Sequence, residues 1–348
     1  MLKVENLSTS YKLIDGDVHV LNDLNFEIHD NEIFGIAGES GCGKTTLLKT
    51  LYDIIEFPLE IDKGKVILSG EKNGQSFSYE SGNIQKTWWN NISYVPQAAQ
   101  SVLNPIVRLK KQFLDSIPQE DRKNETKEQT LARVAKYLEE LNLSPDILES
   151  YPFQLSGGQR QRVAMGRSLV RNPNVFLMDE PLAHLDAKLR NSMRTELKKI
   201  QADLGSTCIY VTHDFLEAMA LGDRIAIVKE GRIVQVGSGD EIYYLPCNKF
   251  VAQLMGEPQI NIIAGKMMVN GSQRQFVINV LGQEVALPMP EDAPLFAKLD
   301  QQDAAKLEMG LRPQNIAYRF EPAEGYFKAT VYSYESIGNK SVIVAECG

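Results

Sequence analysis

A glycine-rich stretch at residues 38–46 has the residue types and the spacing that phosphate binding requires. It reads GESGCGKTT and matches the pattern G-x-x-x-x-G-K-[ST]. Glycines let successive backbone N–H groups turn inward around phosphate oxygens, Lys44 can reach the β- and γ-phosphates, and the Thr45 hydroxyl can ligate Mg²⁺. We therefore expect this stretch, the phosphate loop, to bind a nucleoside triphosphate. Its candidate binding residues are Gly38, Ser40, Gly41, Cys42, Gly43, Lys44, Thr45 and Thr46.

A pair of carboxylates follows a short apolar run further along the chain. Residues 175–180 read VFLMDE, which is typical of a buried strand that ends in Asp179 and Glu180. We expect Asp179 to hold Mg²⁺ through its water shell, and Glu180 to orient or deprotonate the water that attacks the γ-phosphate. Taken by itself, the pair is equally well explained as a solvated acidic turn. The phosphate loop is what favours the catalytic interpretation.

The most specific string in the sequence is LSGGQ at residues 155–159, followed by RQRV. Backbone N–H groups of this string, at the start of a helix, would form a second anion site. One chain has no need of two such sites for one phosphate, unless the two sites come from two copies.

Together these motifs resemble those of the nucleotide-binding subunits of ATP-binding cassette (ABC) transporters. The resemblance implies an ATPase that uses ATP and Mg²⁺. It also implies a head-to-tail dimer, in which the LSGGQ string of one copy closes over the γ-phosphate held by the phosphate loop of the other. The residues of the string that would contact the nucleotide are Ser156, Gly157, Gly158 and Gln159.

Four further positions match functional residues of the ABC family. Tyr11 matches the aromatic residue that stacks on adenine, and Gln97 matches the glutamine that senses Mg²⁺ and the attacking water. Asp186 matches the aspartate of the dimer-contacting loop. His213 matches the switch histidine, and it follows a predicted parallel strand, at the end where α/β sheets bind ligands. The residues expected in catalysis are thus Lys44, Gln97, Glu180 and His213, and those expected to bind the metal are Thr45, Gln97 and Asp179.

Different segments resemble different branches of the family. Residues 96–105, PQAAQSVLNP, resemble the oligopeptide importers, whereas Leu155–Gly166, Leu177–Arg190 and Tyr210–Ile225 resemble the maltose-type carbohydrate importers. Residues 310–316, GLRPQNI, resemble a segment of the transport-associated OB-type (TOBE) domain, which the oligopeptide branch normally lacks. This favours an importer of carbohydrate. An importer of oligopeptides or inorganic ions, and a soluble ABC ATPase without a transport role, remain the alternatives.

The elements that must position these residues have the pattern of an α/β fold. Strand-like runs at 33–37 and 207–212 alternate with helix-like runs at 45–51 and 159–170. We expect a P-loop NTPase ABC cassette over residues 1–237, with a helical subdomain at about 98–155. A linker over 238–258 leads to short alternating strands at 259–348, the pattern of a small all-β, OB-like (TOBE) domain. The chain stops soon after one such strand, so we expect this domain to be cut short.

Composition restricts the partners. The 348 residues carry 37 Lys and Arg against 45 Asp and Glu, a net charge of −8, which argues against a nucleic-acid partner. No apolar run approaches the roughly 20 residues needed to span a bilayer. The resemblance therefore implies a peripheral subunit at the cytoplasmic face of the cell membrane. Its implied partners are a second copy of itself, integral membrane permease subunits and, indirectly, an extracellular solute-binding protein.

Cys42 is a thiol within the phosphate loop, near the expected start of a helix. Such a position favours the thiolate, so we expect Cys42 to ionise more easily than a buried cysteine and to react with alkylating agents unless ATP protects it. The alternative is that Cys42 only fills a small space.

Overall fold

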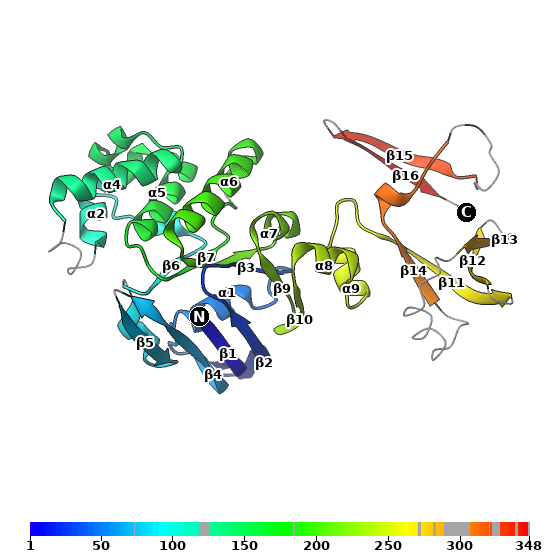
Figure 1. The fold of residues 1–348 in the computed structure, drawn as a ribbon, viewed down its shortest axis with the longest axis horizontal. Helices are drawn as coiled ribbons and strands as arrows, with labels where there is room; N and C mark the ends of the chain where they lie inside the picture. Colours follow the sequence, from blue (N-terminus) through cyan, green and yellow to red (C-terminus); the bar gives the residue numbers. More distant parts are fainter. Residues whose placement is uncertain are drawn as a thin grey trace. The chain divides into compact units, whose positions relative to one another are not determined.

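The computed structural model describes residues 1–72, 74–88, 90–117, 125–183, 185–270, 273–280, 283–288, 307–319, 321, 328–337 and 340–346. The chain forms two compact units, Met1–Cys247 and Asn248–Gly348 (Figure 1). Across the described ranges, no helix combines the length and the apolar character needed to cross a membrane. The boundaries given above, at 237 and 258, stay predictions.

The centre of the first unit is a mostly parallel sheet, in the strand order β10-β9-β3-β8-β7-β6. Its strands are β3 (Ile33–Gly38), β6 (Ile92–Val95), β7 (Val175–Asp179), β8 (Thr207–Thr212), β9 (Arg224–Lys229) and β10 (Arg232–Gly237). Only β10 is antiparallel to its neighbour. Every residue of β3, β7 and β8 is buried, which explains why these strands are almost continuously apolar. The carboxyl ends of β3, β8, β7 and β6 consequently lie side by side at one edge.

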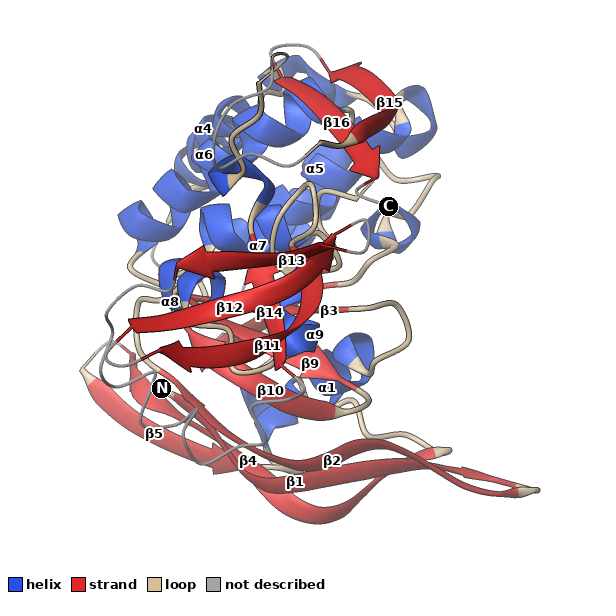
Figure 2. Ribbon diagram, turned by 90° about the vertical axis from the view of Figure 1, so that its right-hand side faces the viewer, coloured by secondary structure: helices blue, strands red, loops and turns tan. Residues whose placement is uncertain are grey.

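An antiparallel sheet forms a second layer of the first unit (Figure 2). Its order is β2-β1-β4-β5, and its strands are β1 (Leu2–Leu13), β2 (Gly16–Ile28), β4 (Leu59–Lys72) and β5 (Gln75–Glu80). Leu2, Val4 and Leu7 of β1 are buried in the same core as Leu47 and Leu48 of helix α1 (Lys44–Leu51). Helix α1 is therefore held by apolar packing against this layer, and this fixes the position of the loop that precedes it.

A helical segment lies between β6 and β7. It comprises the 3₁₀ turns η2 (Ala99–Val102), η3 (Pro145–Glu149) and η4 (Pro152–Gln154) and the helices α2 (Leu109–Ser116), α4 (Lys127–Glu140) and α5 (Gly157–Leu169). Phe113, Val134 and Val163, from the three helices, share one core. Arg162 of α5 donates hydrogen bonds to the carbonyl oxygens of Leu141 and Asn142, at 2.9 and 2.7 Å. These carbonyls follow α4, so a cation compensates the negative end of that helix.

The remaining elements of the first unit are the 3₁₀ turn η1 (Ile84–Thr87) and the helices α6 (Ala187–Leu204), α7 (Phe215–Leu221) and α8 (Gly239–Tyr244). Helices α6 and α7 connect β7 to β8 and β8 to β9. Both begin at an aspartate whose side chain accepts a hydrogen bond from the third residue of the helix, Asp186 for α6 and Asp214 for α7. Aspartate is a preferred residue at this position because it satisfies a backbone donor of the first turn.

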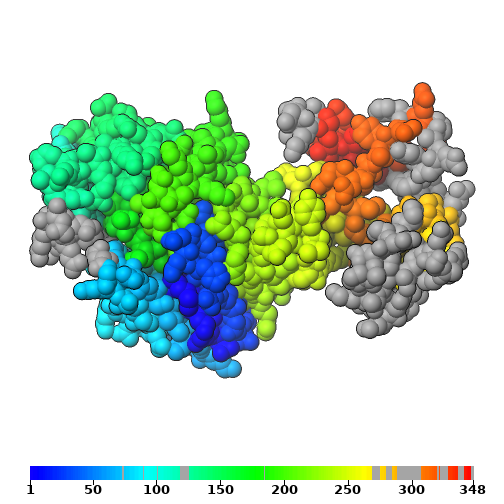
Figure 3. All heavy atoms as spheres, in the orientation of Figure 1, coloured from blue at the N-terminus to red at the C-terminus, as the bar shows by residue number. Residues whose placement is uncertain are grey.

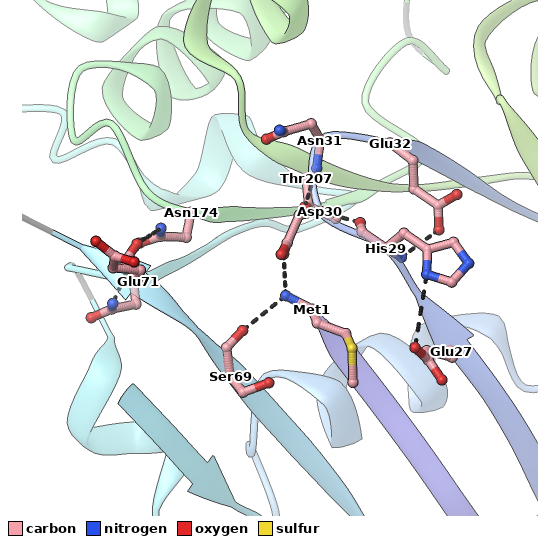
Figure 4. Close-up of polar contacts among 11 residues, drawn as sticks. Met1, Glu27, His29, Asp30, Asn31, Glu32, Ser69, Glu71, Asn174 and Thr207 are labelled. Carbon is pink, nitrogen blue, oxygen red and sulfur yellow. Dashed lines mark hydrogen bonds and ion pairs between the residues drawn. The ribbon is translucent and has the colours of Figure 1, made fainter. Parts of the chain in front are cut away.

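Polar contacts tie the two sheets together at the amino ends of the parallel strands (Figure 4). In the turn between β2 and β3, the Asn31 N–H donates to the Thr207 hydroxyl at 3.0 Å, and this hydroxyl donates to the His29 carbonyl at 3.2 Å. The Met1 ammonium pairs with Asp30 and donates to the Ser69 carbonyl. These contacts brace the edge opposite the phosphate loop.

The second unit contains helix α9 (Lys249–Leu254), the 3₁₀ turn η5 (Pro313–Asn315) and antiparallel strands. One sheet has the order β13-β12-β11-β14, built from β11 (Asn261–Asn270), β12 (Gln273–Val280), β13 (Gln283–Pro288) and β14 (Leu307–Leu311); β15 (Thr330–Ile337) pairs with β16 (Lys340–Glu346). Phe276 and Ile278 of β12 form the buried core of the four-stranded sheet. Arg312, from the GLRPQNI segment, donates to the carbonyl oxygens of Ala252 and Met255 at the end of α9. The expected α/β cassette and all-β region are thus both present.

Candidate functional site

The phosphate loop connects the carboxyl end of β3 to the start of α1. Gly43 precedes the helix with φ of 104°, and Gly41 has φ of 81°, a region that L side chains rarely adopt. At Gly38 the constraint is space, because an added Cβ would lie 2.4 Å from the Val228 carbonyl oxygen. No side chain of the described residues caps helix α1, so its first N–H groups remain donors for an anion. Glycine is therefore required at positions 38 and 43 for different reasons.

Lys44 turns its ammonium group back over this loop. Its Nζ donates to the carbonyl oxygens of Gly38, at 2.8 Å, and Glu39, at 2.9 Å. Only 6% of the residue is exposed. Ser40 and Gly41 lie on the exposed side of the same loop. The loop therefore combines a fixed cation with backbone donors, as binding of a polyphosphate requires.

Cys42 is more buried than its position in the loop suggested. Its residue is 9% exposed, and its Sγ lies 3.9 Å from Lys44 Nζ. Burial raises the pKa of the Cys42 thiol, and the nearby Lys44 charge offsets this only in part. This thiol is therefore harder to ionise than an ordinary cysteine, because loss of water around the sulfur outweighs the favourable charge, whereas full burial raises the pKa of the Cys208 thiol to about 12. The expectation that Cys42 ionises more easily than a buried cysteine stays a prediction.

Asp179 ends β7 with a buried carboxyl group, 1% exposed. Burial raises the pKa of this carboxyl above its ordinary value, and the Thr45 hydroxyl acts in the opposite direction. The Tyr94 hydroxyl donates to Oδ2 at 3.4 Å. The other oxygen, Oδ1, is buried and has no hydrogen-bond partner among the described residues. A buried carboxylate oxygen without a donor, beside a hydroxyl, fits the hard-oxygen environment of a hydrated Mg²⁺.

Glu180, at the end of β7, contacts residues that follow the two neighbouring strands, β6 and β8. Its Oε2 accepts a hydrogen bond from Gln97 Nε2 at 3.1 Å, and its Oε1 lies 3.1 Å from His213 Nδ1. Gln97 follows β6, and His213 follows β8. Glu180 itself has φ of 47°, an uncommon conformation held by a hydrogen bond from its N–H to the Val211 carbonyl at 2.9 Å. The tertiary structure thus brings together three of the four residues expected in catalysis.

Tyr11 lies near the other end of the phosphate loop. Its hydroxyl is 3.2 Å from the Thr46 hydroxyl on α1. Tyr11 is half-buried in β1, and its backbone pairs with Val18 of β2 and Leu59 of β4. The hydroxyl contact holds Tyr11 to the start of α1, and the stacking role of its ring stays a prediction.

The LSGGQ string forms the start of α5. The Gln159 N–H donates to Ser156 Oγ at 3.3 Å, and the Ser156 N–H donates to Gln159 Oε1 at 2.9 Å, a reciprocal cap. Ser156 is exposed, and Gly157 and Gly158 are half-buried. Within the described part of the chain, no hydrogen bond or ion pair joins these residues to the phosphate loop. Asp186 is also exposed, as the cap of α6.

Comparison with known proteins identifies this arrangement. Residues 21–183 match the family model described as ABC transporter. The chain is 35% identical over 336 residues to the osmoprotective compounds uptake ATP-binding protein GgtA of Synechocystis sp., covering 95% of this chain and 84% of that protein. It is 34% identical over 339 residues to the trehalose/maltose import ATP-binding protein MalK of Thermococcus litoralis, covering 96% and 86%. The chain belongs to the ABC transporter family.

A solved structure supports the same conclusion about the fold of the ABC cassette. The dimeric, post-hydrolysis structure of an ATP-binding cassette bound to ADP and phosphate superposes with a TM-score of 0.56 at 27% identity, over 68% of this chain and 98% of that one. The expectations of an ABC cassette and of an ATP-hydrolysing subunit are thereby confirmed.

Two buried side chains of the cassette were missed by the sequence motifs. Gln161 of α5 donates a hydrogen bond from Nε2, at 2.6 Å, to the carbonyl of Pro181, the residue directly after Glu180. Glu217 of α7 accepts a hydrogen bond at 2.6 Å from the hydroxyl of Thr212, the residue directly before His213. Their signal in the sequence is weak: a polar residue at an otherwise apolar helix position. That signal does not identify the partner.

Proposed function

We propose that the chain hydrolyses ATP at the carboxyl edge of its parallel sheet and that this drives the import of a solute. The observation that carries the proposal is the position of Glu180 between Gln97 and His213, directly after the buried Asp179. Glu180 would orient and deprotonate the attacking water, and Gln97 and His213 would hold it in place. Lys44 would exchange its two carbonyl partners for phosphate oxygens. The adenine would stack on Tyr11.

Thr45, Gln97 and Asp179 are the residues proposed to hold Mg²⁺. The unpartnered Oδ1 of Asp179 is the observation that fits such an ion. When bound, Mg²⁺ supplies positive charge that neutralises the phosphate oxygens. The phosphate loop and α1 bind the same phosphates through backbone N–H groups.

A second copy of the chain would complete each site. Ser156 is exposed, and no hydrogen bond or ion pair joins it to the described phosphate loop of its own chain, so its hydroxyl is available as a donor to a partner copy. In the proposed head-to-tail dimer, residues 156–159 close over the γ-phosphate of the other copy. The dimeric form of the similar cassette bound to ADP and phosphate supports this arrangement. Asp186, exposed at the start of α6, would contact the partner in the same interface.

The permease subunits are proposed to dock on the helical segment, which is coloured cyan-green and green on the first unit in Figure 3. Val102, Ile106 and Phe153 expose 52%, 81% and 69% of their surfaces there. Tyr151 stacks on Phe153 and carries Arg108 over its ring, with centroid distances of 5.6 Å in both cases. Exposed apolar and aromatic residues of this kind are typical of protein interfaces. The cassette would thus act at the cytoplasmic face of the membrane, as a peripheral subunit.

The solute is proposed to be a carbohydrate or a similarly polar small molecule, delivered by an extracellular solute-binding protein. Support comes from the relatives, whose names record uptake of osmoprotective compounds, trehalose and maltose. The test is co-purification from native membranes, followed by stimulation of ATPase activity in the purified complex. Maltodextrin-type sugars with the cognate binding protein should stimulate it. Stimulation by oligopeptides instead, or recovery of the chain without membrane subunits, would contradict this assignment.

The catalytic assignment is tested with Glu180→Gln. This variant should bind ATP normally, lose at least about 100-fold in turnover, since general base catalysis is worth at least that much, and form a dimer with ATP. Equilibrium nucleotide binding, phosphate release and light scattering are the measurements. Glu128→Gln, on the exposed face of α4, is the matched control and should behave as wild type. Normal hydrolysis by Glu180→Gln would show that Glu180 is not the catalytic base.

A further inference from the structure

His213 lies between two residues that belong to one buried polar cluster. The Thr212 hydroxyl donates to Glu217 Oε2 at 2.6 Å and accepts a hydrogen bond from the Asp214 N–H at 3.0 Å. Asp214 Oδ1 in turn accepts from the Glu217 N–H at 3.0 Å, as the cap of α7. The backbone on both sides of His213 is therefore fixed by hydrogen bonds to the start of α7.

Arg194 closes this cluster from a different helix. It lies on α6, and its guanidinium group approaches Asp214 Oδ2 at 3.3 Å and Glu217 Oε1 at 3.6 Å. Glu217 is 4% exposed, and burial together with this carboxylate raises the pKa of the neighbouring Tyr210 well above its ordinary value. A carboxylate this deeply buried needs a cationic partner, and among the described residues Arg194 is the cation paired with it.

Helix α6 links this cluster to the exposed aspartate at its own start. Asp186 caps α6, and Arg194 follows eight residues later on the same uninterrupted helix. At 1.5 Å of rise per residue, the two lie about 12 Å apart along the helix axis. A displacement of Asp186 moves Arg194 with it, because an α-helix of this length behaves as a rigid element. The cluster then transmits the movement to the loop that carries His213.

We infer that Arg194 is a positioning residue for His213, and that α6 couples the dimer-facing Asp186 to the catalytic histidine of the same chain. The inference rests on the proposed function, since it assigns His213 to hydrolysis and Asp186 to the dimer interface. Arg194 acts through Asp214 and Glu217, on the loop and helix that hold His213. It orders the loop in which His213 reaches Glu180 at 3.1 Å.

The first test compares Arg194→Gln with Lys198→Gln in the full-length chain. Both substitutions remove one positive charge from α6, but Lys198 is exposed. Arg194→Gln should lower kcat for ATP hydrolysis by about tenfold or more, with KM for ATP within twofold of wild type, because misplacing a catalytic group by even a short distance is costly. Arg194→Lys, which keeps the charge but not the forked geometry, should be intermediate. Lys198→Gln should leave both constants unchanged.

The second test reads the position of His213 directly. The chain has four histidines, and NMR of isotope-labelled imidazole rings resolves them, with His213→Gln used to assign one signal. Arg194→Gln should displace the His213 signal and leave those of His19 and His29 in place, whereas Lys198→Gln should displace none of these three. If Arg194→Gln does not fold, Glu217→Gln keeps the shape of its side chain and should produce the same displacement and the same loss in kcat.

The outcomes separate this inference from the function on which it rests. A folded Arg194→Gln variant with wild-type kcat, or with an undisturbed His213 signal, overturns the positioning role. An equal loss of kcat in Lys198→Gln overturns it as well. If His213→Gln and Glu180→Gln hydrolyse ATP normally, the proposed function itself is wrong.

Discussion

Glu180 has a backbone conformation that few residues other than glycine adopt, and its side chain contacts two other strand ends. Conformations of this kind cost about 1–3 kcal/mol and persist where the surrounding structure imposes them. Here the imposing contact is the hydrogen bond from the Glu180 N–H to the Val211 carbonyl. The conformation turns the side chain away from the path of β7 and toward Gln97 and His213. At the scale of the single residue, the Glu180 carboxylate, proposed as the catalytic base, is thus oriented by its neighbour strand β8.

At the residue scale, Cys42 offers a prediction on pH dependence. Its thiol pKa is raised by burial, so below and around neutral pH it stays protonated, and its alkylation should accelerate only at more alkaline pH than for an ordinary cysteine. The same shift means that the folded protein disfavours the thiolate, so the stability linked to Cys42 is present at low pH and is lost as the pH rises through the raised pKa.

The measurement is the rate of Cys42 modification by iodoacetamide between pH 7 and 10, followed by mass spectrometry. Cys247, which is exposed, provides the internal comparison. Faster labelling of Cys42 than of Cys247 at neutral pH would contradict the burial effect.

At the scale of elements, the site is the edge where four neighbouring parallel strands end. The phosphate loop follows β3, His213 follows β8, Asp179 and Glu180 lie at the end of β7, and Gln97 follows β6. At the opposite edge, the turn between β2 and β3 is hydrogen-bonded to the Thr207 hydroxyl at the start of β8, and these contacts hold the amino ends of the strands in place. Helix α5 reaches the same edge through Gln161 and the Pro181 carbonyl. The helix that begins with LSGGQ is therefore attached directly to the turn that follows Glu180.

Gln161→Leu tests this attachment. The substitution keeps the approximate size of the side chain but leaves the Pro181 carbonyl without its donor, at a cost of about 1–3 kcal/mol for a buried group. We expect a lower free energy of unfolding in urea and a lower kcat for ATP hydrolysis, with ATP affinity unchanged because the phosphate loop is untouched. Wild-type stability together with wild-type turnover would show that the Gln161–Pro181 hydrogen bond contributes neither to stability nor to hydrolysis.

At the scale of the whole molecule, one chain carries two elements proposed to bind phosphate, and its described contacts do not bring them together. The phosphate loop belongs to the sheet, and the LSGGQ string starts a helix of the helical segment. Both have exposed backbone or hydroxyl donors, at Ser40 and Gly41 in the loop and at Ser156 in the string. In a head-to-tail pair of copies, each ATP would lie between the phosphate loop of one copy and the LSGGQ string of the other.

Ser156→Arg, combined with Glu180→Gln, tests the arrangement at this scale. The bulky cation should exclude the partner's phosphate from the LSGGQ string without touching the phosphate loop of its own chain. We expect the double variant to bind ATP as Glu180→Gln does but to remain a monomer in light scattering. Formation of the ATP-dependent dimer despite Ser156→Arg would contradict the proposed role of the string. Loss of ATP binding by the monomer would place Ser156 in the site of its own chain.

The sequence by itself determined the chemistry of each local element. The phosphate loop, the carboxylate pair and LSGGQ are contiguous, and their requirements, such as positive φ at Gly43 or a buried strand before Asp179, are satisfied within a few residues. It also predicted the alternation that gives the α/β sheet and the antiparallel strands that follow it. Local propensity and periodicity suffice for this because they act over short distances along the chain.

Only the tertiary structure decided how these elements meet. The contacts of Glu180 with Gln97 and His213 depend on the strand order, and the pairing of Arg194 with Glu217 depends on how α6 and α7 pack. Neither is encoded in any short segment. The raised pKa of Cys42 has the same origin, because the water removed from a thiol is set by distant residues packed around it, and no motif of neighbouring residues reports that loss of solvation.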